Sequence, residues 1–162
     1  MRKFTITFLI VLTLFSSCSS VVKVLPEHVK KVYVGSFNNY TYEVGLEVEF
    51  TNTVIEEMLK DGRIYPVNTK EESDGILIAK IKRYIYFPLF TFSDTESNQC
   101  GIIIEASVHL IDKNGSKVLW TEPNMKGMQV VYCVTNLKSA KSNIWERFSR
   151  DIIRRTVKVL NN

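Results

Sequence analysis

The chain has 162 residues, of which 45% are hydrophobic, and a formal net charge of +4. This length suits one ordinary domain with a sufficient hydrophobic core, so we expect no second domain. The charge is too small to indicate a nucleic-acid partner. Two histidines and three cysteines without metal-ligand spacing indicate no metal site. We therefore expect a protein without metal, cofactor or nucleic acid.

Residues 1–17 are typical of a secretory signal. Arg2 and Lys3 precede the mostly apolar stretch 4–15, and serines follow it at once. The stretch has 12 residues, whereas a membrane-spanning helix needs about 20. Removal of the signal leaves 145 residues with a net charge of +2, because the segment holds two basic residues and no acidic one.

Cys18 follows the signal directly. The run Leu14-Phe15-Ser16-Ser17-Cys18 resembles the lipobox of bacterial lipoproteins, whose cysteine is acylated and becomes the first mature residue. Phe15 departs from that pattern, which usually has Leu, Val or Ile there. We expect Cys18 to carry the lipid anchor, since several acyl chains attach a protein stably to a membrane. Residues 18–30 would form the lipidated N-terminus and tether, and residues 31–162 the folded domain. The alternative is ordinary signal cleavage that leaves a free Cys18.

The first half of the domain shows strand and helix patterns in turn. Residues 31–37 alternate as a short strand, and the apolar residues of 44–60 recur every four positions, as in an amphipathic helix. Gly62 is the expected helix stop, and residues 63–67 are a candidate for a brief strand. Residues 76–87 then predict a long strand with one apolar face.

The second half predicts a hairpin and a second helix. Residues 101–112 alternate as a strand, and Asn114-Gly115 is typical of a type I′ hairpin turn, after which residues 117–120 return antiparallel. Pro123 predicts an interruption over residues 121–127, before the strand resumes at 128–134.

Cys100 and Cys133 lie in these two strands, in a domain whose export permits disulfides. An uninterrupted hairpin would place Cys100 opposite Gln129, four residues from Cys133 and roughly 13 Å away, which is too far for a bond. If residues 121–127 loop out four residues, the two cysteines face each other. The sequence leaves both arrangements open, a disulfide or two free thiols.

Residues 137–160 predict a second long helix with one apolar stripe and a basic outer side. That side is either a solvated face or a contact for an anionic lipid or polysaccharide. Two such helices and strands with one apolar face predict an α+β, two-layer sandwich. We expect both helices on one face of a mixed, mostly antiparallel four-stranded sheet, in the order β-α-β-β-β-α.

No local motif supplies a catalytic nucleophile with its base, so we do not expect an enzyme. Glu105, Ser107 and His109 share a strand face, but residues two apart on a strand point in parallel rather than converge. Aromatic residues crowd the end of the 76–87 strand, and they either lie buried there or form a hydrophobic patch for a partner. This group is Tyr84, Tyr86, Phe87, Phe90 and Phe92.

Five motifs, in order and spacing, resemble the LptE-type lipopolysaccharide-assembly lipoproteins. They are Phe37-Asn38-Asn39-Tyr40-Thr41-Tyr42-Glu43-Val44-Gly45-Leu46-Glu47, Thr51-Asn52, Asp61-Gly62-Arg63, Ser73-Asp74-Gly75-Ile76-Leu77 and Lys117-Val118-Leu119-Trp120. The resemblance implies two helices on a four-stranded sheet. It also implies an outer-membrane lipoprotein, facing the periplasm, that plugs the LptD β-barrel, assists its assembly and helps to deliver lipopolysaccharide to the outer leaflet.

Basic residues of that family are thought to touch lipopolysaccharide. The loop 93–99 has no Lys or Arg, so Lys138 and Lys141 are the candidate contacts, with Phe90 and Phe92 as candidate partner contacts. A similar pattern recurs in exported lipoproteins that regulate a cell-wall synthase or serve a secretion channel, and this is the alternative function. A hydrolase that uses His109 is a third.

Overall fold

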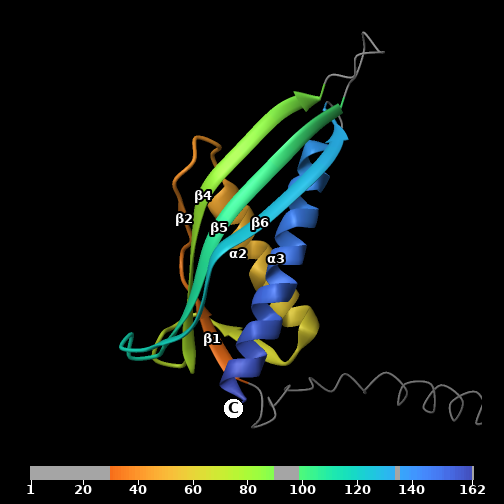
Figure 1. Cartoon of the computed structure of the whole chain (residues 1–162). Coiled ribbons are helices and arrows are strands. Elements are labelled where there is room, and N and C mark those ends of the chain that lie inside the picture. The colour runs from red at the N-terminus through yellow and green to blue at the C-terminus, as the bar shows by residue number, and fades with distance from the viewer. Residues whose placement is uncertain (1–29, 90–98, 134–135, 162) are drawn as a thin grey trace, which may run out of the picture.

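The computed structural model describes residues 30–89, 99–133 and 136–161 of the chain (Figure 1). The elements in chain order are β1 (Lys30–Val34), β2 (Asn38–Asn39), α2 (Leu46–Asp61), β3 (Ile64–Val67), β4 (Gly75–Leu89), β5 (Gln99–Asp112), β6 (Val118–Tyr132) and α3 (Leu137–Leu160). Cys18, Phe90 and Phe92 lie outside the described residues. Within those residues, no helix has the length and apolar character to cross a membrane.

The sheet has six strands, so the expectation of four was wrong. Its order is β3-β1-β4-β5-β6, and β2 pairs separately with β4. β1 pairs in parallel with both β3 and β4, and β2 pairs in parallel with β4, whereas β4, β5 and β6 form long antiparallel ladders. The fold is therefore α+β with a mixed, mostly antiparallel sheet. The additional strands are β3, four residues within the 63–67 stretch that the sequence offered as a candidate, and β2, whose two residues are too few to show a period in the sequence.

Both helices have the apolar stripes that the sequence predicts. The buried residues of α2 are Leu46, Phe50, Val54 and Met58, at the predicted four-residue spacing. α2 ends at Gly62, whose φ of 74° is the left-handed conformation that glycine adopts without a side-chain clash. α3 spans the predicted residues 137–160. Figure 1 shows α2 and α3 behind the sheet, with α3 running alongside β6.

Four aromatic side chains join the helices to the sheet. The ring of Phe50 stacks on Trp145 with centroids 4.5 Å apart, and it also meets Phe37 at 4.9 Å and Phe148 at 6.0 Å. All four are at most 3% exposed. Offset and edge-to-face aromatic pairs add stabilisation beyond the area that they bury. The N-terminal halves of α2 and α3 are fixed to each other at this cluster.

β6 is continuous from Val118 to Tyr132, and the predicted interruption over residues 121–127 was wrong. The register instead shifts in small steps, one near Leu110 and one between Ala106 and Val108. At the second step, Lys82 Nζ donates to the Pro123 carbonyl oxygen at 2.8 Å and to Asn124 Oδ1 at 3.0 Å. The bulge thus accommodates Pro123, because the Lys82 side chain forms hydrogen bonds with polar groups that are not paired with the neighbouring strand.

The sheet narrows toward one end. β1 starts at the end of the molecule where α3 finishes, and the paired ends of β4 and β5 project at the opposite end (Figure 1). Beyond Ile81, β4 has only β5 as a paired neighbour among the strands that the structure describes. We call this part the distal ribbon, defined by residues 83–89, 99–105 and 126–132.

Candidate partner-binding site

A pocket of about 500 Å³ lies between the distal ribbon and the first turns of the two helices. Its lining residues come from three segments that are distant in the sequence: Glu43, Glu49, Tyr84, Tyr86, Leu137, Lys138 and Lys141. The pairing register places Tyr84 and Tyr86 on the same sheet face as the buried Ile104 and Ile102. The two rings therefore point toward the helices and form the apolar wall of the pocket.

The turn before α2 positions Glu43 at this pocket. Asn39 Oδ1 accepts the Thr41 N–H at 2.9 Å, and Asn39 Nδ2 donates to the Glu43 carbonyl oxygen at 2.7 Å. Gly45 follows with a φ of 89°, a conformation that a residue with a side chain rarely adopts. A local side-chain turn of this kind fixes the backbone that leads into a helix.

Lys141 is the most enclosed charge of the pocket. Its side chain is 13% exposed and lies 3.2 Å from Glu43 Oε1 and 3.5 Å from Glu49 Oε1. Burial opposes its charge, but the hydrogen bond to Glu43 and the negative charges of Glu49 and Glu43 outweigh burial and raise the pKa of Lys141. Trp145 Nε1 donates to Glu49 Oε2 at 3.4 Å, which ties this ion cluster to the aromatic core.

Lys141 and Lys138 have different surroundings, although the sequence predicts the same role for both. Lys141 is paired with two carboxylates, Glu43 in the turn before α2 and Glu49 in its first turn, whereas Lys138 is exposed at the rim of the pocket. Nothing local in the sequence joins Lys141 to Glu43, which lies 98 residues earlier. The contact of either lysine with lipopolysaccharide stays a prediction.

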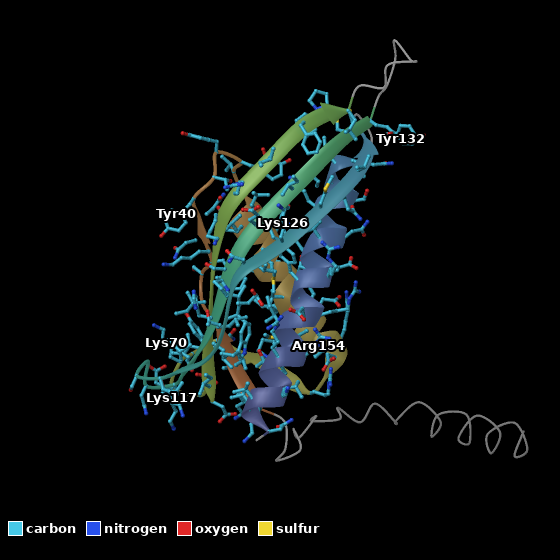
Figure 2. All side chains as sticks on the ribbon, in the orientation of Figure 1. Tyr40, Lys70, Lys117, Lys126, Tyr132 and Arg154 are labelled. Atoms are coloured by element: carbon cyan, nitrogen blue, oxygen red, sulfur yellow. A yellow bond between two sulfur atoms is a disulfide. The ribbon has the colours of Figure 1, made fainter. Side chains whose placement is uncertain are left out.

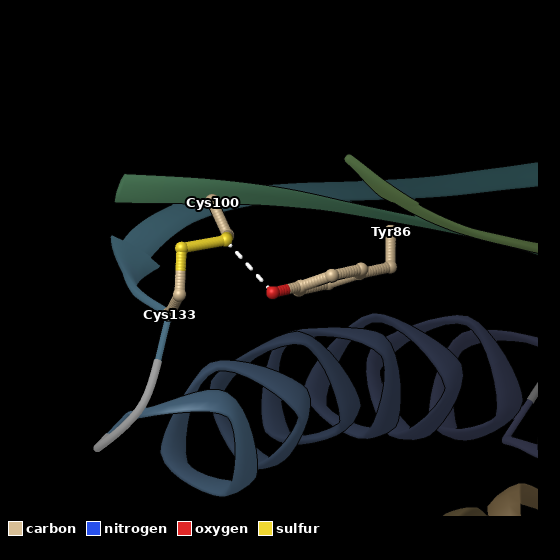
Figure 3. Close-up of a disulfide and its surroundings, with 3 residues drawn as sticks. All are labelled: Tyr86, Cys100 and Cys133. Carbon is tan, nitrogen blue, oxygen red and sulfur yellow. Dashed lines mark hydrogen bonds between the residues drawn. A yellow bond between two sulfur atoms is a disulfide. The ribbon is translucent and has the colours of Figure 1, made fainter. Parts of the chain in front are cut away.

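Cys100 and Cys133 form a disulfide in the structure, next to the pocket (Figure 3). Cys100 pairs with Val131, two residues beyond the Gln129 of an uninterrupted hairpin, and the Cα atoms of the two cysteines are 5.0 Å apart. This shift of two residues brings Cys133, which directly follows β6, within bonding distance of Cys100. The Tyr86 hydroxyl lies 2.9 Å from Cys100 Sγ, with its ring between the sheet and α3.

The opposite face of the distal ribbon carries apolar side chains that neither α2 nor α3 covers. Three rows of residues cross this face, each with one residue from β4, one from β5 and one from β6. They are Ile85, Ile103 and Met128, then Phe87, Gly101 and Val130, then Leu89, Gln99 and Tyr132. Met128, Val130 and Tyr132 are 50%, 48% and 60% exposed. The Phe87 ring covers Gly101, where a Cβ would come within 2.2 Å of Phe87 Cζ. The residues of these three rows form a mostly apolar surface, which we call the outer patch. It is a candidate contact surface for a partner.

The residues that could suggest catalysis have separate partners. Glu105 lies 3.5 Å from Arg83 Nε and 3.3 Å from Lys126 Nζ, so it forms an ion triad across three strands. His109 Nδ1 is 2.6 Å from Thr121 Oγ1 on the neighbouring strand. Within the described ranges, no group of three or more His, Cys, Asp or Glu side chains could hold a metal ion.

Part of the basic side of α3, which includes Arg154 (Figure 2), is paired with carboxylates. Asp151 forms ion pairs with both Arg154 and Arg155, and Arg155 also lies 3.1 Å from Glu122. Burial opposes the charge of Asp151, but the hydrogen bonds from Arg155 and Arg154 outweigh it and lower its pKa. This arrangement fits the solvated-face interpretation better than an anion-binding surface.

Comparison with solved structures shows that this fold is shared at low identity. A hypothetical protein from Chlamydia trachomatis has a TM-score of 0.58 at 11% identity and covers 82% of this chain and 98% of its own. The PelC dodecamer from Paraburkholderia phytofirmans has a TM-score of 0.53 at 14% identity, with coverages of 76% and 88%. A minor lipoprotein from Acinetobacter baumannii has a TM-score of 0.51 at 9% identity, with coverages of 80% and 93%. No curated protein matches the chain.

The family is shown by a different comparison. The LptE family model, described as lipopolysaccharide-assembly, matches residues 29–158. This range contains every element from β1 to α3 except the last residues of that helix. The chain belongs to the LptE family of lipopolysaccharide-assembly lipoproteins.

Proposed function

We propose that this protein is the lipoprotein partner of an LptD-type β-barrel, that it plugs and helps to assemble the barrel, and that it assists delivery of lipopolysaccharide to the outer leaflet. The observation that carries this proposal is the family match over residues 29–158. The outer patch supports it, because exposed apolar side chains grouped on one surface are typical of a surface that contacts another protein.

Cys18 supplies the membrane attachment in this proposal. Acyl chains on Cys18 would hold the domain on the periplasmic side of the outer membrane through a short tether that ends at β1. The Cys18→Ala variant is expected to leave the membrane fraction, whereas the matched Ser19→Ala variant stays in it. Equal membrane retention of the two variants would contradict acylation of Cys18.

The partner is tested by purification from detergent-solubilised membranes. A tag at the C-terminus is expected to recover a large β-barrel protein in a stable ratio. The Val130→Lys variant, which puts a charge in the outer patch, is expected to recover less barrel than the matched Lys117→Glu variant at the other end of the sheet. Recovery of a penicillin-binding synthase in place of a barrel would support the alternative, regulation of a cell-wall enzyme.

A further inference from the structure

Among the strands that the structure describes, none pairs with the outer edge of β4 beyond Ile81, so this edge is open along the distal ribbon. β1 and β2 pair with β4 up to Ile81, whose carbonyl oxygen accepts the Tyr40 N–H at 3.0 Å. The chain then turns away, because Thr41 donates its N–H to the Asn39 side chain. No strand in the described parts of the chain occupies this edge from Arg83 to Leu89.

Pro88 indicates which backbone groups face the open edge. It stays in register opposite Cys100, and its neighbours Phe87 and Leu89 are paired as well. Proline has no N–H, so it keeps its place in a ladder where that group would point away from the neighbouring strand. Backbone groups alternate in direction along a strand. Tyr84 and Tyr86 therefore present their N–H and C=O groups to the same open edge as Pro88.

The two edges of the ribbon carry similar features that discourage pairing with another strand, but at different places. β6 has Pro123 and a register shift just before the ribbon, and Lys126 within it. β4 has a register shift and Arg83 before Tyr84 and has Pro88 at the far end, and the four residues from Tyr84 to Phe87 contain no charged residue or proline. This stretch is the template for strand addition, because Tyr84 and Tyr86 offer both N–H and C=O groups while Pro88 adds a C=O group only.

The pocket under this edge determines which side chain fits. Tyr84, Tyr86 and Leu137 supply apolar walls, and the two lysines of the lining balance its two glutamates. A charged side chain would gain no net electrostatic attraction there and would lose hydration. The pocket is therefore suited to one uncharged, apolar side chain.

We propose that an extended segment of the barrel partner adds to the Tyr84–Pro88 edge of β4, continues the line of β2 and places one apolar side chain in the pocket. The occupant is a polypeptide because the edge offers alternating backbone donors and acceptors at strand spacing, which an extended chain matches. The proposal rests on the proposed function, since the barrel is the partner that supplies the segment.

Hydrogen exchange on the unmodified protein tests this directly. The amides of Tyr84 and Tyr86 are expected to exchange about tenfold or more slowly in the purified barrel complex than in the free protein, because they gain hydrogen bonds there. The hairpin 113–117 at the other end of the sheet is the internal control and is expected to keep its rates. A recovered complex in which the Tyr84 and Tyr86 amides keep their free rates would overturn the proposal and leave the proposed function intact.

A pair of variants tests the backbone contribution. Tyr86→Pro removes an edge-facing N–H, and Tyr86→Val removes the same ring but keeps that N–H. We expect Tyr86→Pro to recover the barrel about fivefold to tenfold less than Tyr86→Val, the effect of one lost hydrogen bond, and thermal unfolding verifies that both are folded. Equal recovery by two folded variants would overturn strand addition at this edge. Failure to recover a barrel with the unmodified protein would overturn both proposals.

Discussion

The half of the domain next to β1 and the distal ribbon are stabilised in different ways. Where α2 and α3 cover the sheet, Phe50, Trp145 and Phe148 are at most 2% exposed, and this core extends to the inner face of the distal ribbon, where Gly127 lies beside Phe148. In the distal ribbon, β4 has one open edge, and one sheet face carries half-exposed apolar residues. A disulfide and an ion cluster take part of the role that burial has in the other half.

This difference separates stability from binding. Burial of apolar side chains stabilises the fold, and side chains that are buried in this way are not available to a partner. The distal ribbon keeps an open edge, a pocket and an apolar face available, and covalent and ionic contacts hold it in shape. A variant of a buried side chain or of the disulfide should therefore change unfolding, and a variant at the open edge or in the outer patch of the distal ribbon should change binding more than unfolding.

The largest effect is expected for Phe50→Ala in the packed half. Removal of a buried aromatic ring leaves a cavity and should lower the free energy of unfolding by about 3–5 kcal/mol. The matched control is Val48→Ala on the same helix, where the side chain is 56% exposed. Urea unfolding of both variants measures the difference, and equal losses would contradict the assigned core.

Loss of the disulfide should have the next largest effect. The bond closes a sequence separation of 33 residues, so the Cys100→Ser, Cys133→Ser double variant should lose about 2–4 kcal/mol of unfolding free energy. The mass of the unreduced protein should be lower than that of the reduced protein by two hydrogens. An unchanged mass on reduction would show that the two thiols are free.

A smaller contrast is expected between two glycines of the sheet. A Cβ on Gly127 would lie 2.4 Å from Ile144 Cγ2 in the buried side of α3, whereas a Cβ on Gly101 would meet the tip of the Phe87 ring. Overpacking a core costs about 1–3 kcal/mol, and we expect this loss for Gly127→Ala. Gly101→Ala should cost less, because the ring can swing toward solvent. A greater loss for Gly101→Ala in urea unfolding would contradict this order.

The smallest effect is a loss of stability at alkaline pH. Burial opposes the charge of Lys141, but the hydrogen bond to Glu43 and the charges of Glu49 and Glu43 outweigh burial and raise the pKa of Lys141. Burial, and then the negative charge of Glu43, raise the pKa of Tyr84. A raised folded pKa contributes stability that is complete below the unfolded pKa and is lost as the pH rises through the folded pKa. Unfolding free energy should thus fall above about pH 10, and Lys141→Met should make that fall shallower. Parallel pH profiles for both proteins would exclude this contribution.

Local patterns predicted much of the fold. The four-residue spacing of Leu46, Phe50, Val54 and Met58 identified α2 and its buried side, and the stripe of α3 identified its full length. These predictions were possible because a helix face repeats at a fixed interval in the sequence. The order and spacing of the motifs also indicated the LptE family, which the family match confirms. The candidate site was predicted only in fragments, as Lys138, Lys141 and a cluster of aromatic residues.

The sequence by itself determined the helices, the presence of the hairpin, one face of each long strand and the family, because each depends on residues that are close in the chain or on motif order. The type I′ turn predicted at Asn114-Gly115 was wrong: Gly115 has a φ of 72°, but Asn114 does not have a positive φ, and Asp112 closes a longer turn with Lys117. Only the tertiary structure decided the six-strand sheet, the small register shift that brings Cys100 to Cys133, and the pairing of Lys141 with Glu43. These features depend on contacts between distant segments, and a shift of one residue in register changes which side chains meet. The open edge of β4 belongs to the same group, since it exists where β2 stops pairing and the chain turns toward α2.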